Sequence, residues 1–339
     1  MSNSRETTVR PRQSGNHDSK SSEGTSHCHR WGLILAGGDG TRLLTLTRGI
    51  TGDDRPKQFC TVIGNDTLLQ QTQRRVARLI PAWRTMLVLT AKHEPFYGAA
   101  VAEIPRTRLV IQPTSRGTAP AILNTMLRVR EMDPKAIVAC FPSDHHFSDD
   151  ATFIRHIESA FAAVAYRPET VVLLGIPPET PEVEYGWIEP GIPIEGPLAR
   201  SMCEVSRFWE KPPAAVASHL MAEGCLWNSF VMVGHVQTFV DLAQHALPST
   251  SEAFESARRS LFTAAEGEAF NEVYSGIRNT CFSKHVLSVQ PDRLAVLHAD
   301  GLGWNDLGDP GRVRSVLEGM LIRTERRLEP DVSLTAALK

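Results

Sequence analysis

The first half of the sequence alternates between short apolar runs of strand length and longer stretches with apolar residues at helical spacing. The expected helices are Thr67–Ile80, Gly117–Arg130 and Asp150–Tyr166, the last with Asp149 or Asp150 as N-cap. The expected strands are Trp31–Ala36, Met86–Thr90, Arg108–Gln112, Ala136–Phe141 and Val171–Gly175. Strands separated by helices form parallel sheets covered on both faces, with ligands outside the carboxyl ends of the strands. We therefore predict an α/β, Rossmann-like fold with a mostly parallel central sheet flanked by helices.

The pattern changes after about Pro177, where turns rich in Pro and Gly flank shorter elements. We expect strands at Tyr185–Glu189, Cys203–Trp209 and Leu294–His298, and helices at Pro213–Glu223, Val236–Ala246, Ser251–Ala265 and Pro310–Arg323. The chain has no internal repeat and no long linker, so we expect one domain over residues 30–327. Residues 1–29 hold almost nothing that a core could bury and are expected to form a disordered tail. Residues 328–339 are expected to form a short C-terminal tail.

Charge and cysteine usage exclude several classes of partner. The formal net charge is −2, so bulk charge does not attract the chain to nucleic acid or to a membrane. Its apolar runs fall short of the roughly 20 residues of a membrane span, and the first 30 residues lack the apolar core of a secretory signal. The six cysteines are scattered without a C-x-x-C pair, as expected for reduced thiols in the cytoplasm. The spacing of His27, Cys28 and His29 matches no standard metal site.

A glycine-rich loop, Gly37 to Arg42, follows the first expected strand. Glycines at this place let backbone N–H groups approach a phosphate or a base. The loop is not a dinucleotide fingerprint, because Leu43 stands at the third glycine position, and it lacks the Gly-Lys-Ser/Thr end of a P-loop. A tight turn would explain the glycines alone. It would not explain the arginine that follows them, or the Pro-Lys-Gln-Phe run at residues 56–59.

The segments LAGGDGTRL and PKQF resemble the signature of the sugar-1-phosphate nucleotidyltransferases. The Gln-Phe ending is similar to that of the mannose-1-phosphate guanylyltransferases. Further segments resemble the same family in the same order: QPTSRGTAPAI (residues 112–122), FPSDHHF (141–147), YGWIEPG (185–191), FWEKP (208–212), WNSF (227–230) and GWNDLGD (303–309). The resemblance spans about residues 31–309 and implies a GT-A-type nucleotidyltransferase fold.

The resemblance implies a reaction in which a nucleoside monophosphate passes from a nucleoside triphosphate to a sugar-1-phosphate. GTP and mannose-1-phosphate are the expected substrates, and GDP-mannose and pyrophosphate the expected products. The implied catalytic residues are Arg42, which can fork onto the triphosphate, Lys57 as a point cation, and Asp144. Asp144 and Asp306 are the implied ligands of Mg²⁺, a hard cation that prefers oxygen. The sequence leaves open whether the chain forms a homodimer.

The resemblance also implies two binding sets. The nucleotide-binding set is Leu35, Ala36, Gly37, Gly38, Gly40, Thr41, Arg42, Gln112, Arg116, Gly117, Thr118 and Ser143. The sugar-phosphate-binding set is Tyr185, Gly186, Glu210, Lys211 and Asn228.

Several of these residues have simpler interpretations. Asp144 could cap a turn, Asp306 could be an ordinary turn residue, and Lys211 could be a surface lysine. Tyr185, Trp187 and Trp227 could be core aromatics. His145 and His146 invite a zinc interpretation, but adjacent residues in a strand point to opposite faces, so at least one is expected to be structural.

The sequence departs from the family pattern at three places. Thr45 stands where a proline is usual, and the segment before Lys57, expected to be a loop over Arg48–Arg55, is longer than in many relatives. Cys281–Ser288 lacks two acids that many guanylyltransferases carry there. These departures leave open another sugar-phosphate or base, and also a regulatory homologue that binds a nucleotide-sugar without turnover. We expect neither a phosphomannose isomerase module nor a sizeable left-handed β-helix after Asp309.

Overall fold

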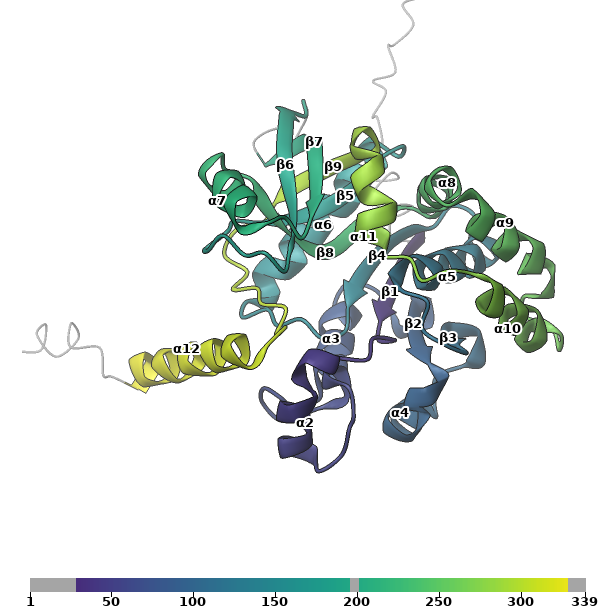
Figure 1. Cartoon of the computed structure of the whole chain (residues 1–339), viewed down its shortest axis with the longest axis horizontal. Coiled ribbons are helices and arrows are strands. Elements are labelled where there is room, and N and C mark those ends of the chain that lie inside the picture. The colour runs from purple at the N-terminus through teal and green to yellow at the C-terminus, as the bar shows by residue number, and fades with distance from the viewer. Residues whose placement is uncertain (1–28, 196–200, 329–339) are drawn as a thin grey trace, which may run out of the picture.

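A nine-stranded sheet forms the centre of the computed structural model, which describes residues 29–195 and 201–328. The strands are β1 (Arg30–Leu35), β2 (Thr85–Thr90), β3 (Leu109–Gln112), β4 (Ile137–Pro142), β5 (Val171–Ile176), β6 (Gly186–Pro193), β7 (Met202–Glu210), β8 (Leu226–His235) and β9 (Leu294–His298). Their order is β3-β2-β1-β4-β8-β5-β9-β7-β6 (Figure 1). Of the tails expected at residues 1–29 and 328–339, residues 1–28, with the His27-Cys28 pair, and residues 329–339 lie outside the described residues. His29 is described and its ring pairs with Asp133 at 2.8 Å, and Leu328 is the last residue of the C-terminal helix.

The prediction of a mostly parallel sheet is wrong. β1, β2, β3 and β4 pair in parallel, as do β5 and β9. The pairings β4–β8, β5–β8, β6–β7, β6–β8 and β7–β9 are antiparallel. The sheet is therefore mixed, and the β6–β8 pairing closes a ring of strands that runs β8–β5–β9–β7–β6.

Three of the five antiparallel pairings involve β8, which the apolar pattern does not predict as a strand. Its sequence LWNSFVMVGH places Asn228 and Ser229 inside an otherwise apolar run, although both are buried. Ser229 Oγ donates to the carbonyl of Leu174 at 2.7 Å, which satisfies its hydroxyl inside the sheet. β8 lies between β4 and β5 and runs antiparallel to both, so it joins the two parallel parts.

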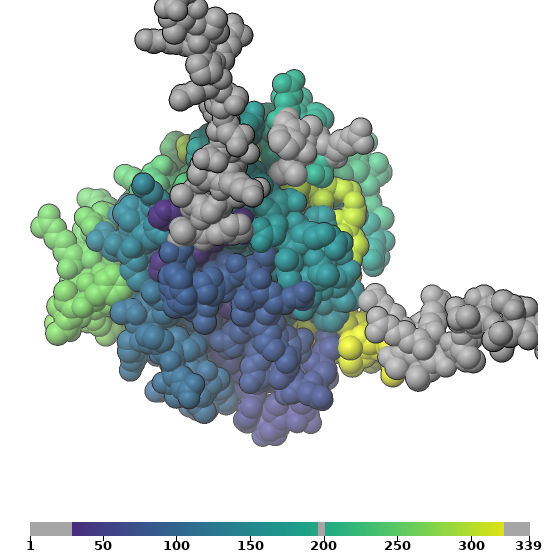
Figure 2. Space-filling view, turned by 180° about the vertical axis from the view of Figure 1, so that it is seen from behind, coloured from purple at the N-terminus to yellow at the C-terminus, as the bar shows by residue number. Residues whose placement is uncertain are grey.

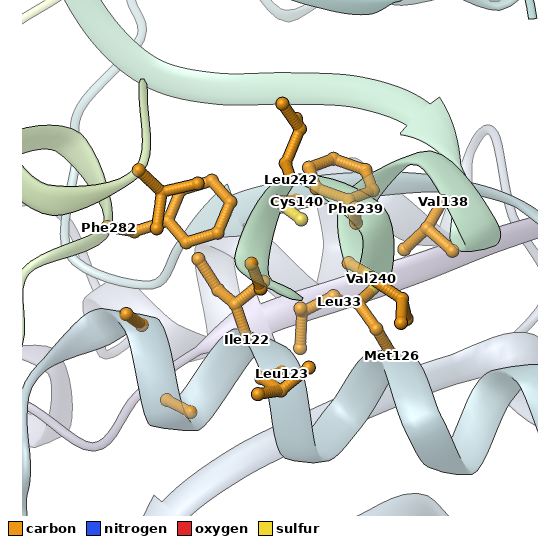
Figure 3. Close-up of a cluster of buried hydrophobic side chains, with 14 of the residues drawn as sticks. Leu33, Ile122, Leu123, Met126, Val138, Cys140, Phe239, Val240, Leu242 and Phe282 are labelled. Atoms are coloured by element: carbon orange, nitrogen blue, oxygen red, sulfur yellow. The ribbon is translucent and has the colours of Figure 1, made fainter. Parts of the chain in front are cut away.

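Helices cover both faces of the sheet, as predicted. One face packs on α5 (Thr118–Met132), α8 (Val236–Ala246), α9 (Pro248–Ala257) and α10 (Glu266–Gly276). Figure 3 shows Ile122, Leu123 and Met126 of α5 among side chains of β1, β4 and α8. The other face packs on α3 (Leu68–Ala77), α4 (Glu94–Val101) and α6 (Asp150–Tyr166). Leu33 and Ile34, adjacent in β1, belong to opposite faces, as strand alternation requires.

Local signals account for several helix boundaries. Thr67 and Gln70 form a capping box at the start of α3, and Asp149 caps α6 by accepting a hydrogen bond from the Thr152 N–H at 2.9 Å. α6, α8 and β9 have the predicted bounds. The single helix predicted over Ser251–Ala265 is wrong, because α9 ends at Ala257 and α10 begins at Glu266.

Four further helices complete the described part of the chain. They are α2 (Leu44–Thr51), α7 (Ala214–Ala222), α11 (Phe282–His285) and α12 (Pro310–Leu328). The segment predicted as a loop over Arg48–Arg55 therefore begins inside α2, which Gly52 ends with a left-handed φ of 79°. α12 projects from the body in Figure 1, and its yellow atoms lie at the margin of the view from behind in Figure 2. None of the described helices is long and apolar enough to cross a membrane.

Candidate active site

The glycine-rich loop leaves the carboxyl end of β1 and packs against the segment that carries Lys57. Gln58 Nε2 donates to the carbonyls of Ala36 (3.1 Å) and Gly38 (2.7 Å). Gly40 has a left-handed φ of 62°, and a Cβ there would lie 3.1 Å from the Lys57 backbone nitrogen. A Cβ on Gly37 would lie 2.6 Å from Gln112 Nε2. The left-handed conformation favours glycine at Gly40, whereas a side chain at Gly37 would displace the end of the Gln112 side chain. The close packing of the loop keeps Lys57 beside it.

Lys57 connects two segments far apart in the sequence. Its Nζ lies 3.3 Å from Asp144 Oδ2 and donates to the carbonyls of Asp306 (2.5 Å) and Leu307 (3.1 Å). The lysine is 7% exposed, so its charge is largely withdrawn from water. An unpaired ammonium would be costly there, and Asp144 supplies the counter-charge. The structure thus brings together three residues that the sequence analysis assigned to catalysis and metal binding.

Asp306 is a buried carboxylate rather than an exposed turn residue. Its Oδ1 accepts hydrogen bonds from Tyr185 Oη (2.9 Å), the Gly308 N–H (2.9 Å) and Arg312 Nη1 (2.8 Å). Its Oδ2 faces Arg42, whose Nη2 is 4.0 Å away. Burial raises the pKa of the Asp306 carboxyl, but the surrounding positive charges and the Tyr185 hydrogen bond outweigh burial and lower it below its usual value. Asp306 is therefore ionised at neutral pH.

Arg312 was not found by sequence reasoning, although it is the main structural partner of Asp306. Its Nη2 lies 2.5 Å from Glu182 Oε2, and its guanidinium carbon lies 4.5 Å from the centre of the Tyr185 ring. Arg312 sits in the first turn of α12, where Asp309 accepts from its N–H at 3.1 Å. A basic residue in the turn after GWNDLGD is the only local signal that could have pointed to it.

His145 and His146 have different surroundings. His145 accepts a hydrogen bond at Nδ1 from Trp304 Nε1 (3.2 Å), and its Nε2 is 3.9 Å from Asp144 Oδ1. Burial lowers the pKa of His145, so the imidazole is neutral at pH 7. His146 exchanges both backbone hydrogen bonds with Asn305, at 2.8 and 3.0 Å. That bridge holds the Asp144 and Asp306 segments side by side.

Among the residues described, no group of three or more His, Cys, Asp or Glu side chains is arranged to hold a metal ion. Asp144 and Asp306 therefore offer a two-carboxylate set. Asp306 Oδ1 accepts from three donors, whereas Oδ2 has the Arg42 guanidinium 4.0 Å away and is the oxygen that a cation could bind. Mg²⁺ is commonly bound by one or two carboxylates together with water and substrate phosphates. The donor chemistry fits Mg²⁺ and does not fit zinc, which prefers four protein ligands in a structural site.

The residues assigned to the sugar-phosphate lie where β6, β7 and β8 meet. Gly186 pairs with Glu210, and a Cβ on Gly186 would lie 3.2 Å from Glu210 Oε2 and 3.3 Å from Asn228 Cβ. Burial raises the pKa of the Glu210 carboxyl, which Lys211, Lys284 and His285 only partly offset. Lys211 has a left-handed φ of 50°, and its N–H donates to the Tyr185 carbonyl at 3.1 Å.

The aromatic residues near this site divide into two kinds. Trp187 is fully buried, and its Nε1 donates to the Glu182 carbonyl at 2.8 Å, so it is a core residue. Tyr185 packs on Trp227 and Trp304, with ring centres 5.1 and 5.0 Å apart, while its hydroxyl reaches Asp306. Tyr185 thus connects the aromatic cluster to the carboxylate.

The rest of the nucleotide-binding set lies on two sides of the glycine loop. The Ser143 N–H donates to the Leu35 carbonyl at 3.1 Å, which extends the β1–β4 pairing beyond the strands. Thr41 and Arg42 form the short 3₁₀ turn after the glycines. The Gln112 side chain occupies the space where a side chain of Gly37 would lie, and its Oε1 accepts from Tyr274 Oη at 3.4 Å.

Residues Arg116 to Thr118 are held instead by the segment that leads into α11. Arg116 Nε donates to the Tyr274 carbonyl (3.0 Å), and Thr118 Oγ1 accepts from the Phe282 N–H (2.8 Å). Gly117 has a φ of 84°, and a Cβ there would lie 2.3 Å from the Thr280 carbonyl oxygen. Sequence reasoning missed Tyr274, which has no motif around it.

Several known proteins are similar to this chain in sequence. The xanthan biosynthesis protein XanB of Xanthomonas campestris pv. campestris is 28% identical over 294 residues, which cover 84% of this chain and 59% of that protein. The mannose-1-phosphate guanylyltransferase of Sinorhizobium fredii is 30% identical over 281 residues, 81% of this chain and 52% of that protein. The chain thus spans little more than half the length of these curated relatives.

A solved structure from Thermus thermophilus, described as a mannose-1-phosphate geranyltransferase, superposes with a TM-score of 0.70 at 31% identity. The match covers 83% of this chain and 76% of that one. Residues 31–321 match the family model described as nucleotidyl transferase. Since that match covers most of the chain, the chain belongs to the nucleotidyl transferase family.

Proposed function

We propose that the chain transfers a nucleoside monophosphate from a nucleoside triphosphate to a sugar-1-phosphate, with GTP and mannose-1-phosphate as substrates. One observation carries the proposal: Lys57 joins Asp144 and Asp306 directly beside the glycine loop. The names of several relatives at 26–30% identity support guanylyl transfer to mannose-1-phosphate. Such a reaction would place the protein in the cytoplasm, where nucleoside triphosphates are supplied.

In the proposed reaction, an oxygen of the sugar-1-phosphate forms a bond to the α-phosphorus of the triphosphate. The bond from that phosphorus to the oxygen bridging the α- and β-phosphates breaks, and pyrophosphate leaves with the electron pair. The attacking phosphate is already an anion at neutral pH, so no general base is needed. The chemistry requires mainly that two polyanions be brought together and their charge offset.

Different residues of this chain would bind the nucleotide, offset the phosphate charge and bind the sugar-1-phosphate. Gly37, Gly38 and Gly40 leave room for the nucleotide, and Arg42, half exposed, binds the triphosphate by a bidentate fork. Lys57, already buried, stabilises charge near the reacting phosphorus without reorganising. Asp144 and Asp306 would hold Mg²⁺, which when bound offsets phosphate charge. Glu210 and Asn228 bind sugar hydroxyls, and Lys211 binds the sugar phosphate.

A second candidate is the same reaction with another sugar-1-phosphate. The segment Cys281–Ser288 forms α11 and the turn after it, and it places Lys284 and His285 within electrostatic range of Glu210. These two basic side chains near Glu210, the carboxylate assigned to the sugar, favour a sugar whose substituents differ from those of mannose. A regulatory homologue that binds a nucleotide-sugar without turnover is the third outcome that the experiment must separate.

The test is a screen of four nucleoside triphosphates against a panel of sugar-1-phosphates, with Mg²⁺ present and pyrophosphate as the readout. The proposal expects the highest kcat/KM for GTP with mannose-1-phosphate. A clear preference for another pair would select the second candidate. No turnover with any pair, together with calorimetric binding of a nucleotide-sugar, would select the regulatory homologue.

A further inference from the structure

Glu184 lies between two cations that the proposed function assigns to different substrates. Its Oε2 accepts from Arg42 Nη1 and from Lys211 Nζ, both at 3.2 Å. Arg42 follows the glycine loop and Lys211 follows β7, so the carboxylate links the nucleotide side of the site to the sugar-phosphate side. The three side chains are 47–52% exposed, so substrate can reach them.

The backbone around Glu184 is held in place. Its N–H donates to Glu182 Oε1 at 3.0 Å, and Glu182 in turn pairs with Arg312. On the other side of the bridge, Lys211 is held by its hydrogen bond to the Tyr185 carbonyl in a left-handed conformation that a lysine rarely adopts. Backbone strain of this kind persists where the surroundings enforce it, commonly at functional sites. The bridge therefore joins two anchored segments.

We propose that Glu184 competes with the phosphate groups of both substrates for Arg42 and Lys211. In the ligand-free protein its carboxylate neutralises Arg42 and Lys211 and holds them together. A triphosphate or a sugar phosphate carries more negative charge than one carboxylate, so it displaces Glu184 from either cation. A carboxylate that stays nearby then repels the phosphate, and substrate affinity is lower than the two cations alone would give.

The inference rests on the proposed function for the roles of Arg42 and Lys211. The bridge itself does not depend on those roles. Because the three groups are half exposed, solvent screens the effect, and each ion pair is weak. We therefore expect removal of the Glu184 charge to tighten phosphate binding by about 3–10-fold at low salt. The gain shrinks as salt rises, since screening acts over ~10 Å at 0.1 M ionic strength.

The test compares the full chain with Glu184→Gln and Glu179→Gln by calorimetry, using inorganic tripolyphosphate as the probe at low and high salt. Glu179 is an exposed carboxylate of the same segment, so its change alters net charge equally and leaves the bridge intact. We expect tighter binding in Glu184→Gln alone, with a steeper salt dependence. KM for both substrates should fall in that variant.

Equal or weaker tripolyphosphate binding in Glu184→Gln, or the same gain in Glu179→Gln, overturns the inference. A rise in KM would show that Glu184 positions the cations instead of competing for them. These results are separable from failure of the proposed function. If no substrate pair is turned over, the proposed function fails, while the calorimetric comparison still decides whether Glu184 competes with phosphate.

Discussion

Lys57 Nζ lies 3.3 Å from Asp144 Oδ2, although 87 positions separate the two residues in the sequence (144 − 57). The same ammonium donates to the carbonyls of Asp306 and Leu307, so one side chain contacts the segments of both candidate metal ligands. A shift of either segment would leave a buried charge without its partner. The contacts of Lys57 therefore hold the two segments of the site together.

Replacing Lys57 with alanine should lower kcat by on the order of 10²–10³, because one pre-organised charge at the reacting phosphorus is lost. The melting temperature should also fall, since Asp144 loses its counter-charge and two carbonyls lose a donor. Pyrophosphate release and thermal unfolding measure the two effects. Arg48→Ala is the control, because Arg48 is exposed and pairs with Asp54 away from these groups. Full activity in folded Lys57→Ala protein would contradict the assignment.

Asp306→Asn should lose activity and also lower the free energy of unfolding at pH 7 by about 1–3 kcal/mol, because Arg312 loses a largely buried charged partner. The pKa of Asp306 is lowered in the folded state, so the stability it contributes is present above its unfolded pKa and is lost as pH falls. Denaturation between pH 6 and about 3 should therefore show a steeper loss for wild type than for Asp306→Asn.

Asp309→Asn is the matched control for that experiment. Asp309 also pairs with Arg312, but it is 48% exposed and caps α12 instead of facing the site. Its replacement should retain activity and change stability less than that of Asp306. Equal acid sensitivity of wild type and Asp306→Asn would show that the carboxylate is not held in its ionised form by its neighbours.

The sequence predicts the half of the fold in which strands alternate with helices and neighbouring strands pair in parallel. β1 to β4 and their helices are short-range units, and the glycine loop and Lys57 belong to them. β8 is not predicted, because its two buried polar residues interrupt the apolar pattern. Ser229 is satisfied by a tertiary hydrogen bond to the Leu174 carbonyl, and Asn228 accepts from the nearby Phe230 N–H. Tyr274 and Glu184 are missed for a related reason, because Gln112 and Arg42, which contact them, lie far along the chain, as does the Glu182 partner of Arg312. A surface-like residue in sequence becomes a site residue only when the fold brings its partner to it.

Glu210→Gln should raise the stability of the protein near neutral pH and weaken its use of the sugar-1-phosphate. Burial raises the folded pKa of Glu210 above its unfolded value, so its contribution to stability is greatest at low pH and is lost as pH rises through the folded pKa. At pH 7–8 burial of the ionised carboxylate therefore lowers the free energy of unfolding, and a neutral amide removes this penalty. We expect a higher melting temperature at pH 7.5, by about 2–4 °C for each kcal/mol recovered, and a smaller difference at pH 4.5.

The same variant should raise KM for the sugar-1-phosphate, because an amide replaces the acceptor proposed for a sugar hydroxyl. Glu223→Gln serves as control, since Glu223 is exposed at the end of α7. If Glu210→Gln were less stable at pH 7.5 and equally active, Glu210 would be a structural residue, and the proposed sugar site would lose its central acceptor.

Gly117→Ala should separate α11 from the start of α5. At a φ of 84° an alanine is strained, and its Cβ would overlap the Thr280 carbonyl oxygen, so the segment holding Arg116 and Thr118 must move. We expect a loss of about 1–3 kcal/mol in stability and a higher KM for the triphosphate. Gly49→Ala is a sharp control, because Gly49 lies inside α2 with open space around it, and alanine should stabilise a helix interior by about 0.5–1 kcal/mol. An unchanged KM in folded Gly117→Ala protein would remove residues 116–118 from the nucleotide site and leave Gln112 as its contact on that side.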